Sequence, residues 1–254
     1  MIRAFFATWG GAFRDTAELA RRLPLLIAAM VAVELIQHVV EVKVGMFGPV
    51  PADRKAASMD AVRLGFGWTK MAAVFALDFF ATRYFVTRDT VEAMRPSRHA
   101  GRRYLGVAAF QAVIAAVVIY AAGILALFGI GEDRVMALRF VAASGQQLLE
   151  PLLMLWYANA AMGTHAYGPL RSARATGWFY PWALLLIFVA RLPFSAAHQM
   201  LNRWPAGKGA GLLWPALVLD AVIVGIMVAL LAAIQVRIAR FIADQRGVAL
   251  LGKG

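Results

Sequence analysis

The sequence predicts a single-domain, all-α polytopic membrane protein over residues 1–254, with six transmembrane helices behind an N-terminal amphipathic helix. The first observation is composition: 61% of the residues are hydrophobic, 16% are charged, and the mean hydropathy is +0.67. Soluble domains are about half apolar and about a quarter charged, so this chain has too little polar surface to cover itself in water. The second is the absence of cysteine, which excludes disulfides, thiol catalysis and cysteine-ligated zinc.

Six long apolar segments are the third observation. Each is long enough to cross about 30 Å of hydrocarbon as a helix. They are apolar on all sides, which excludes the alternating pattern of a membrane barrel. No linker divides them, and a tight helical hairpin joins the third to the fourth at Gly131–Arg134. The segments are Leu23–Val42, Gly65–Val86, Leu105–Ile130, Val135–Met162, Trp178–Leu201 and Leu212–Val236.

The residues before the first span predict an amphipathic helix that lies in the membrane interface. Arg21 and Arg22 mark the turn into the span. The alternative, a signal peptide, lacks a small-residue cleavage site. The apolar side chains that follow helical spacing are Ile2, Phe5, Phe6, Trp9 and Phe13.

The distribution of Lys and Arg predicts the orientation. Segments on the N-terminal side of the membrane carry 15 of these residues, and segments on the opposite side carry 7. The positive-inside rule therefore predicts that both termini lie on the cytoplasmic side of a bacterial-type inner membrane. The net charge is +12. Because the basic residues occupy short segments between apolar runs, we expect the partner to be the anionic lipid of the bilayer and not nucleic acid.

The densest basic segment lies between the second and third spans. We interpret it as the topological signal that holds this loop inside. Contact with lipid phosphates is the alternative. Its arginines are Arg95, Arg98, Arg102 and Arg103.

Polar side chains within two of the spans form the candidate intramembrane cluster. In the first span they recur at spacings of three, four and seven, so they share one helix face that avoids lipid. In the fourth span they precede Pro151, which bends the helix and frees backbone carbonyls. A kinked packing helix and a cation site are both open interpretations. The residues are Glu34, Gln37, His38, Glu41, Gln146, Gln147 and Glu150.

An ion pair is expected between the fifth and sixth spans, where Arg191 meets Asp220 or another mid-depth acid. The pair either fixes helix register or forms a gate. Glu34, Glu150 and Asp220 face the single Arg191 near mid-depth. We therefore expect at least one of Glu34 and Glu150 to be uncharged, unless a cation or a wet cavity compensates it.

No metal or cofactor is expected. Glu34, His38, Glu41 and Glu150 offer ligands, but the paired E-x-x-H motifs of helical di-iron sites are missing. Haem ligation by His38 with His198 is a weaker alternative. The nucleotide-binding, serine-hydrolase and zinc-protease motifs are also missing from the sequence.

Ahead of the fifth span, Gly168–Thr176 reads GPLRSARAT and is followed by aromatic residues. This resembles the small basic motif before the fifth helix of YciC-like six-helix inner-membrane proteins and of the membrane domain of some glycerophosphodiester phosphodiesterases. Pro169 and the alanine-rich spacing depart from that motif. The resemblance implies a six-helix bundle without an assigned reaction, and it carries over no catalytic residue.

Three function classes follow from these features. The first is a structural or accessory subunit that packs against a membrane complex or lipid. The second is a small-molecule or ion transporter or channel that uses the mid-membrane carboxylates. The third is a membrane enzyme acting on lipid, and the missing motifs weigh against an enzyme.

The orientation gives a first testable prediction. A cysteine placed at Ser97, in this cysteine-free chain, lies on the cytoplasmic side. We expect a membrane-impermeant thiol reagent to leave it unlabelled in intact cells and to label it after permeabilisation. Labelling in intact cells would reverse the predicted orientation.

Overall fold

The computed structural model describes residues 2–251, apart from the side chain of Glu132, and every regular element in that range is a helix. The elements, with η marking short 3-10 helices, are α1 (Ile2–Arg22), α2 (Pro24–Lys43), α3 (Pro51–Ala57), α4 (Ala61–Thr87), α5 (Thr90–Met94), α6 (Arg98–Ile119), α7 (Ala121–Leu127), η1 (Glu132–Arg134), α8 (Val135–Leu149), η2 (Glu150–Leu153), α9 (Met154–Met162), α10 (Pro169–Thr176), η3 (Gly177–Phe179), α11 (Tyr180–Arg203) and α12 (Ala210–Gln245).

Five helical stretches of the described chain are long and apolar enough to cross a membrane, which confirms the all-α membrane fold. The remaining expected span, the fourth, Val135–Met162, is helical but not continuous. It is divided into α8 and α9 by η2, because Pro151 has no backbone N–H for an α-helical hydrogen bond. The five stretches are Pro24–Lys43, Ala61–Thr87, Arg98–Ile119, Pro169–Arg203 and Ala210–Gln245.

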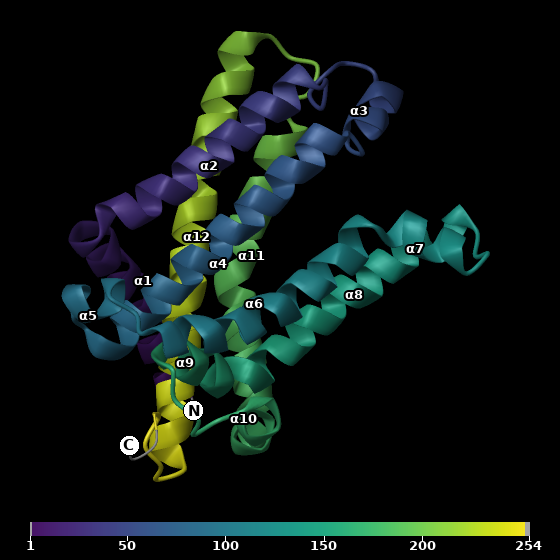
Figure 1. Ribbon diagram of the computed structural model, residues 1–254. Coiled ribbons are helices and arrows are strands. Elements are labelled where there is room, and N and C mark those ends of the chain that lie inside the picture. The colour runs from purple at the N-terminus through teal and green to yellow at the C-terminus, as the bar shows by residue number, and fades with distance from the viewer. Residues whose placement is uncertain (1, 252–254) are drawn as a thin grey trace.

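The last helix, α12, is the axis of the bundle. It contacts α1, α2, α4, α9 and α11, and α2, α4 and α11 run beside it in Figure 1. Its buried face is rich in small residues such as Gly225 and Ala229, which let neighbouring backbones approach closely. A Cβ at Gly225 would lie 3.1 Å from Val31 of α2. The small residues on this face of α12 therefore determine how closely α2 can pack against it.

The helices α6, α7 and α8 form a long hairpin that diverges from α4 toward its tip (Figure 1). The turn falls at η1, as the sequence predicted. None of the described residues of α8 is buried. The hairpin therefore packs on the rest of the protein mainly at its base, through α9 and η2.

The N-terminal helix α1 packs against α12. Small and polar residues, including Thr8, Gly11 and Asp15, form its buried face. Asp15 lies 2.6 Å from the Arg237 guanidinium of α12 and 2.8 Å from that of Arg88. The interfacial placement predicted for α1 stays a prediction, while its docking on α12 through Asp15 is a finding.

Two glycines give a matched prediction about stability. Gly163 ends α9 at φ +76°, and a Cβ there would lie 3.1 Å from the backbone of Ala100 in α6. We expect Gly163→Ala to lower the free energy of unfolding by about 1–2 kcal/mol, because an L side chain is strained in this conformation. Gly145→Ala lies mid-helix in α8 with no atom within 4 Å, so it should be neutral or stabilising by up to about 1 kcal/mol.

Thermal unfolding of both variants in the same detergent would measure the difference. Equal shifts in melting temperature would contradict the role given to Gly163.

Candidate functional site

A buried network of ionisable and polar side chains joins the C-terminal halves of α2 and α11 to the N-terminal halves of α4 and α12. In Figure 1 these halves of the helices lie toward α3, away from the chain termini. We call this network the distal network. It joins α2, α4, α11 and α12, and Glu34, His38 and Asp220 in it are at most 1% exposed. Lipid offers no hydrogen-bond partners, so such groups must find them inside the protein. The members are Glu34, Gln37, His38, Glu41, Arg63, Lys70, His198, Asn202 and Asp220.

Asp220 is the centre of the distal network. Its Oδ1 lies 2.8 Å from His198 Nδ1, and its Oδ2 lies 3.0 Å from His38 Nε2. Asn202 Nδ2 donates to Oδ2 at 2.8 Å. One carboxylate of α12 therefore holds α2 and α11 in register.

His38 lies between two carboxylates. Its Nδ1 is 3.0 Å from Glu41 Oε2, and its Nε2 is 3.0 Å from Asp220 Oδ2. An imidazolium satisfies both contacts as a double donor, whereas a neutral ring requires one of the acids to hold the proton. In either form the two contacts hold two protons, and the second proton of the imidazolium can instead lie on Glu41 or Asp220.

Two cations of α4 pair with the acids of α2. Lys70 Nζ lies 2.6 Å from Glu34 Oε1, and Arg63 Nε lies 3.3 Å from Glu41 Oε1. Gln37 donates to the same Glu41 oxygen at 3.0 Å. The other oxygen of Glu34, Oε2, is buried and has no hydrogen-bond partner among the described side chains. The amide oxygen of Gln37 is likewise buried without a described partner, so the distal network contains two unsatisfied acceptors.

The sequence interpretation missed Lys70 and Arg63 as network members. A lysine inside the apolar segment Gly65–Val86 is itself a signal, since it is costly in hydrocarbon. The expectation that Glu34 or Glu150 is uncharged depended on Arg191 being the single cation near mid-depth. That premise is corrected, because packing of α4 against α2 gives Glu34 a cation of its own.

A second cluster, the central network, surrounds Glu150. Arg191 Nη2 lies 2.8 Å from Glu150 Oε2, and Gln235 donates to Glu150 Oε1 at 2.8 Å. The expected pair between Arg191 and Asp220 is wrong, and its stated alternative, another mid-depth acid, is found. The cause is helix register: His198 lies opposite Asp220, and Arg191 is seven residues away from His198 along α11, or about 10 Å.

A polar cavity of about 90 Å³ lies within the central network. Gln146 and Glu150 line it, whereas Gln147 is exposed on another face of α8. Asp78 also lines it and accepts a hydrogen bond from Tyr104. Since a water molecule occupies about 30 Å³, the cavity has room for about three waters.

The two networks share helix faces. On α11, Arg191, His198 and Asn202 are separated by seven and four residues, which places them on one face. On α4, Lys70 of the distal network and Asp78 beside the central cavity are eight residues apart, or about 12 Å. Polar groups therefore occupy two levels of the same bundle interior.

The metal-binding capacity of the distal network is limited by its own contacts. Ligand atoms of Glu34, His198 and Asp220 lie within 4.8 Å of one another, a donor set of the kind that transition metals accept. Lys70 and Asn202 already occupy oxygens of these acids. Glu150 belongs to the other network, so the four ligands considered from the sequence do not meet at one point. The absence of a metal stays a prediction.

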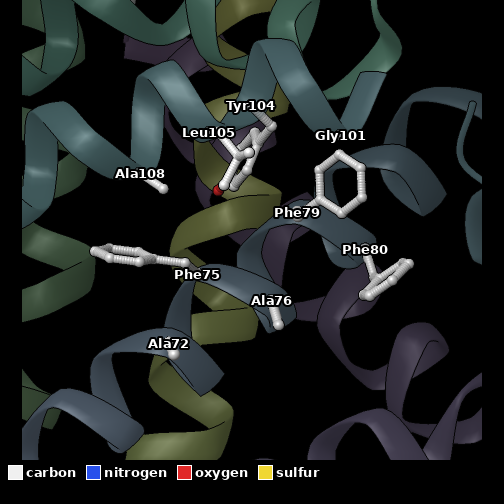
Figure 2. Close-up of a pocket in the computed structure, with 9 residues that line it drawn as sticks. All are labelled: Ala72, Phe75, Ala76, Phe79, Phe80, Gly101, Tyr104, Leu105 and Ala108. Atoms are coloured by element: carbon white, nitrogen blue, oxygen red, sulfur yellow. The ribbon is translucent and has the colours of Figure 1, made fainter. Parts of the chain in front are cut away.

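An apolar cavity of about 420 Å³ lies between α4 and α6. Figure 2 shows Phe75, Phe79 and Phe80 of α4 and Tyr104 and Leu105 of α6 around it. Its wall presents almost no polar surface, because the Tyr104 hydroxyl is engaged by Asp78. It offers no groups for recognition chemistry, and we leave it out of the candidate site.

The basic segment lies at the start of α6. Arg95, Arg98 and Arg102 are exposed, while Arg103 contacts His165 of the loop after α9. Partial desolvation and the Arg103 guanidinium hold the pKa of His165 below its ordinary value. The exposure of these three arginines is compatible with the predicted lipid-phosphate contact, which stays a prediction.

A comparison of the chain with protein-family models, with curated proteins and with solved structures found no match. The resemblance to YciC-like proteins therefore stays a prediction.

The Arg191–Glu150 pair gives a prediction by double-mutant cycle. Arg191→Met alone should lower the free energy of unfolding by about 3 kcal/mol, because it leaves Glu150 buried without its cation. Adding Glu150→Gln should recover most of that loss, and the measurement is thermal stability in detergent.

The control cycle combines Arg191→Met with Asp220→Asn. These residues have no shared contact in the described structure, so their losses should add. Additive losses for Arg191 with Glu150, or strong coupling of Arg191 to Asp220, would contradict the geometry.

Proposed function

We propose that the protein is a transporter that moves a small solute across the membrane in a cycle linked to protonation of the distal network. The observation that carries the proposal is the position of His38 between Glu41 and Asp220, with 3.0 Å on each side. All three side chains are at most 4% exposed and lie in helices of spanning length. Shared protons among buried acids and histidines mark proton pathways in pumps and transporters.

The arrangement of the two networks supports this proposal. A proton that leaves the distal network meets the central network about 10–12 Å further along α4 and α11. The cavity beside Glu150 has room for about three waters, and waters between ionisable groups carry protons.

The transporter acts, in this proposal, in a bacterial-type inner membrane with both termini in the cytoplasm. The count of 15 basic residues on the terminal side against 7 on the opposite side supports that orientation. The distal network then lies toward the outer surface. The arginines at the start of α6 face the anionic lipid of the inner leaflet.

A second candidate function is that of a structural or accessory subunit. It is favoured by α8, whose described residues are all at least partly exposed and include Met136, Phe140 and Val141 at 65% or more. A partner helix could cover this apolar face, and so could lipid. No feature of the described residues favours a lipid-modifying enzyme.

Proton movement tests the proposed function. In liposomes that enclose a pH-sensitive dye, an imposed membrane potential should drive protons through the wild type. Asp220→Asn should reduce this flux about tenfold or more, since a positioned proton-transfer group typically speeds such a step by about 10²-fold. The flux is measured in chloride and again in phosphate, so that a coupled solute is present in one condition.

The matched control is Asp53→Asn, which makes the same chemical change on the exposed surface of α3. It should leave the flux unchanged. If the wild type, in both salts, is as tight as protein-free liposomes, the transport proposal fails and the structural role is favoured.

A further inference from the structure

We propose that the cavity between α4 and the α6–α8 hairpin binds a tetrahedral oxyanion, such as a phosphate group, through Arg63, Lys70 and Arg139. The cavity has a volume of about 400 Å³. Gln37 of α2 lines one side, and Val118 of α6 lies on the hairpin side. Its lining residues come mainly from α4, α6 and α8, and the hairpin of α6 and α8 diverges from α4 in Figure 1.

The lining of this cavity has one sign of charge. Three cations and the amide of Gln37 line it, and no acidic side chain is among the described residues of its wall. The acids Glu34 and Glu41 lie behind Lys70 and Arg63 at the 2.6 and 3.3 Å contacts already described. The cavity is therefore lined by positive charge, and it lies at the edge of the distal network, where Glu34 and Glu41 already pair with Lys70 and Arg63.

Arg139 distinguishes this cavity from a simple network of ion pairs. Its Nε donates to the carbonyl oxygen of Val118 at 3.1 Å, and none of the described carboxylates pairs with it. The side chains of Lys70 and Arg63 are 20% and 24% exposed, so neither is fully enclosed by its pairing with an acid of α2. Arg139 is therefore the one cation of the three without a described carboxylate partner, and an anion bound beside it offsets the cost of that charge close to hydrocarbon.

The donor set fits an oxyanion. Arginine presents a planar fork of N–H groups that matches two oxygens of a phosphate or carboxylate, and lysine adds a compact charge. Arg63 and Lys70 of α4 and Arg139 of α8 line the same cavity, so donors from two helices can reach different oxygens of one tetrahedral anion. A volume of about 400 Å³ accommodates a phosphate together with a small substituent.

Lys70 links this cavity to the distal network. It pairs with Glu34 Oε1 at 2.6 Å, and the same glutamate oxygen lies 3.6 Å from His38 Nε2. An anion that draws the ammonium toward the cavity weakens the Lys70–Glu34 pair. Glu34, which already has one unpartnered oxygen, then accepts the proton of His38, and His38 takes a replacement proton from water, so that anion binding is accompanied by the net uptake of one proton. The coupling of anion binding to proton uptake rests on the proposed transport function, while the binding site rests on the cavity alone.

Binding of inorganic phosphate and of sulfate to the purified protein tests the site by calorimetry. Sulfate is included because its charge does not change near neutral pH. We expect Arg139→Gln to weaken both affinities about tenfold or more, as loss of a charge-assisted hydrogen bond does. This variant should fold, since it loses one described side-chain hydrogen bond, to a backbone carbonyl.

The matched control is Arg134→Gln at the tip of the same hairpin, where the side chain is 71% exposed. It removes the same charge away from the cavity and should leave the affinity unchanged. Native mass spectrometry of protein from membranes distinguishes the source of the anion. A phospholipid retained by the wild type and lost in Arg139→Gln identifies a lipid phosphate as the occupant, whereas sulfate and phosphate binding without retained lipid identifies a free anion.

If neither anion nor phospholipid binding differs between the wild type and Arg139→Gln, the site is overturned. The coupling has its own measurement: sulfate binding in two buffers of different ionisation enthalpy reports the protons taken up. Uptake that is present in the wild type and lost in His38→Gln supports the coupling, and binding without uptake overturns it. Because binding is measured without flux, failure of the site and failure of the transport proposal are distinguishable.

Discussion

The carboxylate of Asp220 is the contact on which the distal half of the bundle depends. It is fully buried in α12 and holds His38 of α2 and both His198 and Asn202 of α11. In hydrocarbon an unpaired carboxylate is costly, so each helix that supplies a partner must keep its register relative to α12. The alanine- and glycine-rich face of α12 permits the close approach, and Asp220 fixes where along the helices that approach occurs.

Away from this centre, the other buried acids pair with cations that come from neighbouring helices. Each buried acid of α2 takes a cation from α4, and Glu150 takes one from α11. At the end of the bundle that holds the chain termini, Asp15 of α1 lies between two arginines. Pairing confined to neighbouring helices accounts for the cohesion of the bundle. It leaves the α6–α8 hairpin comparatively free, since that hairpin contributes few charges to these pairs.

Structural pairing and transport differ in what must move. In the central network both carboxylate oxygens of Glu150 accept hydrogen bonds, one from Arg191 and one from Gln235. In the distal network His38 contacts two carboxylates, so that a proton can lie on any of the three groups, and one oxygen of Glu34 has no partner among the described side chains. Arg139 stands beside it across an open cavity. The distal network is therefore the part of the molecule in which a ligand can change the pattern of contacts at small cost, which is why both proposals are placed there.

The sequence by itself determined the helical class, the positions of the long apolar segments, the hairpin turn near Gly131–Arg134 and the polar face of α2. These properties are local, because hydropathy, helical periodicity and turn residues act over a few residues. It also placed Pro151 where the fourth segment is interrupted.

Only the tertiary structure decided which charges meet. Helix register assigned Arg191 to Glu150 and gave Asp220 two histidines instead. The packing of α4 on α2 brought in Lys70 and Arg63, and the splay of the hairpin set Arg139 beside them. Ionic partners depend on the rotation and relative height of whole helices. A shift of one turn moves a side chain by about 5 Å, which is more than an ion pair tolerates and which no local pattern in the sequence records.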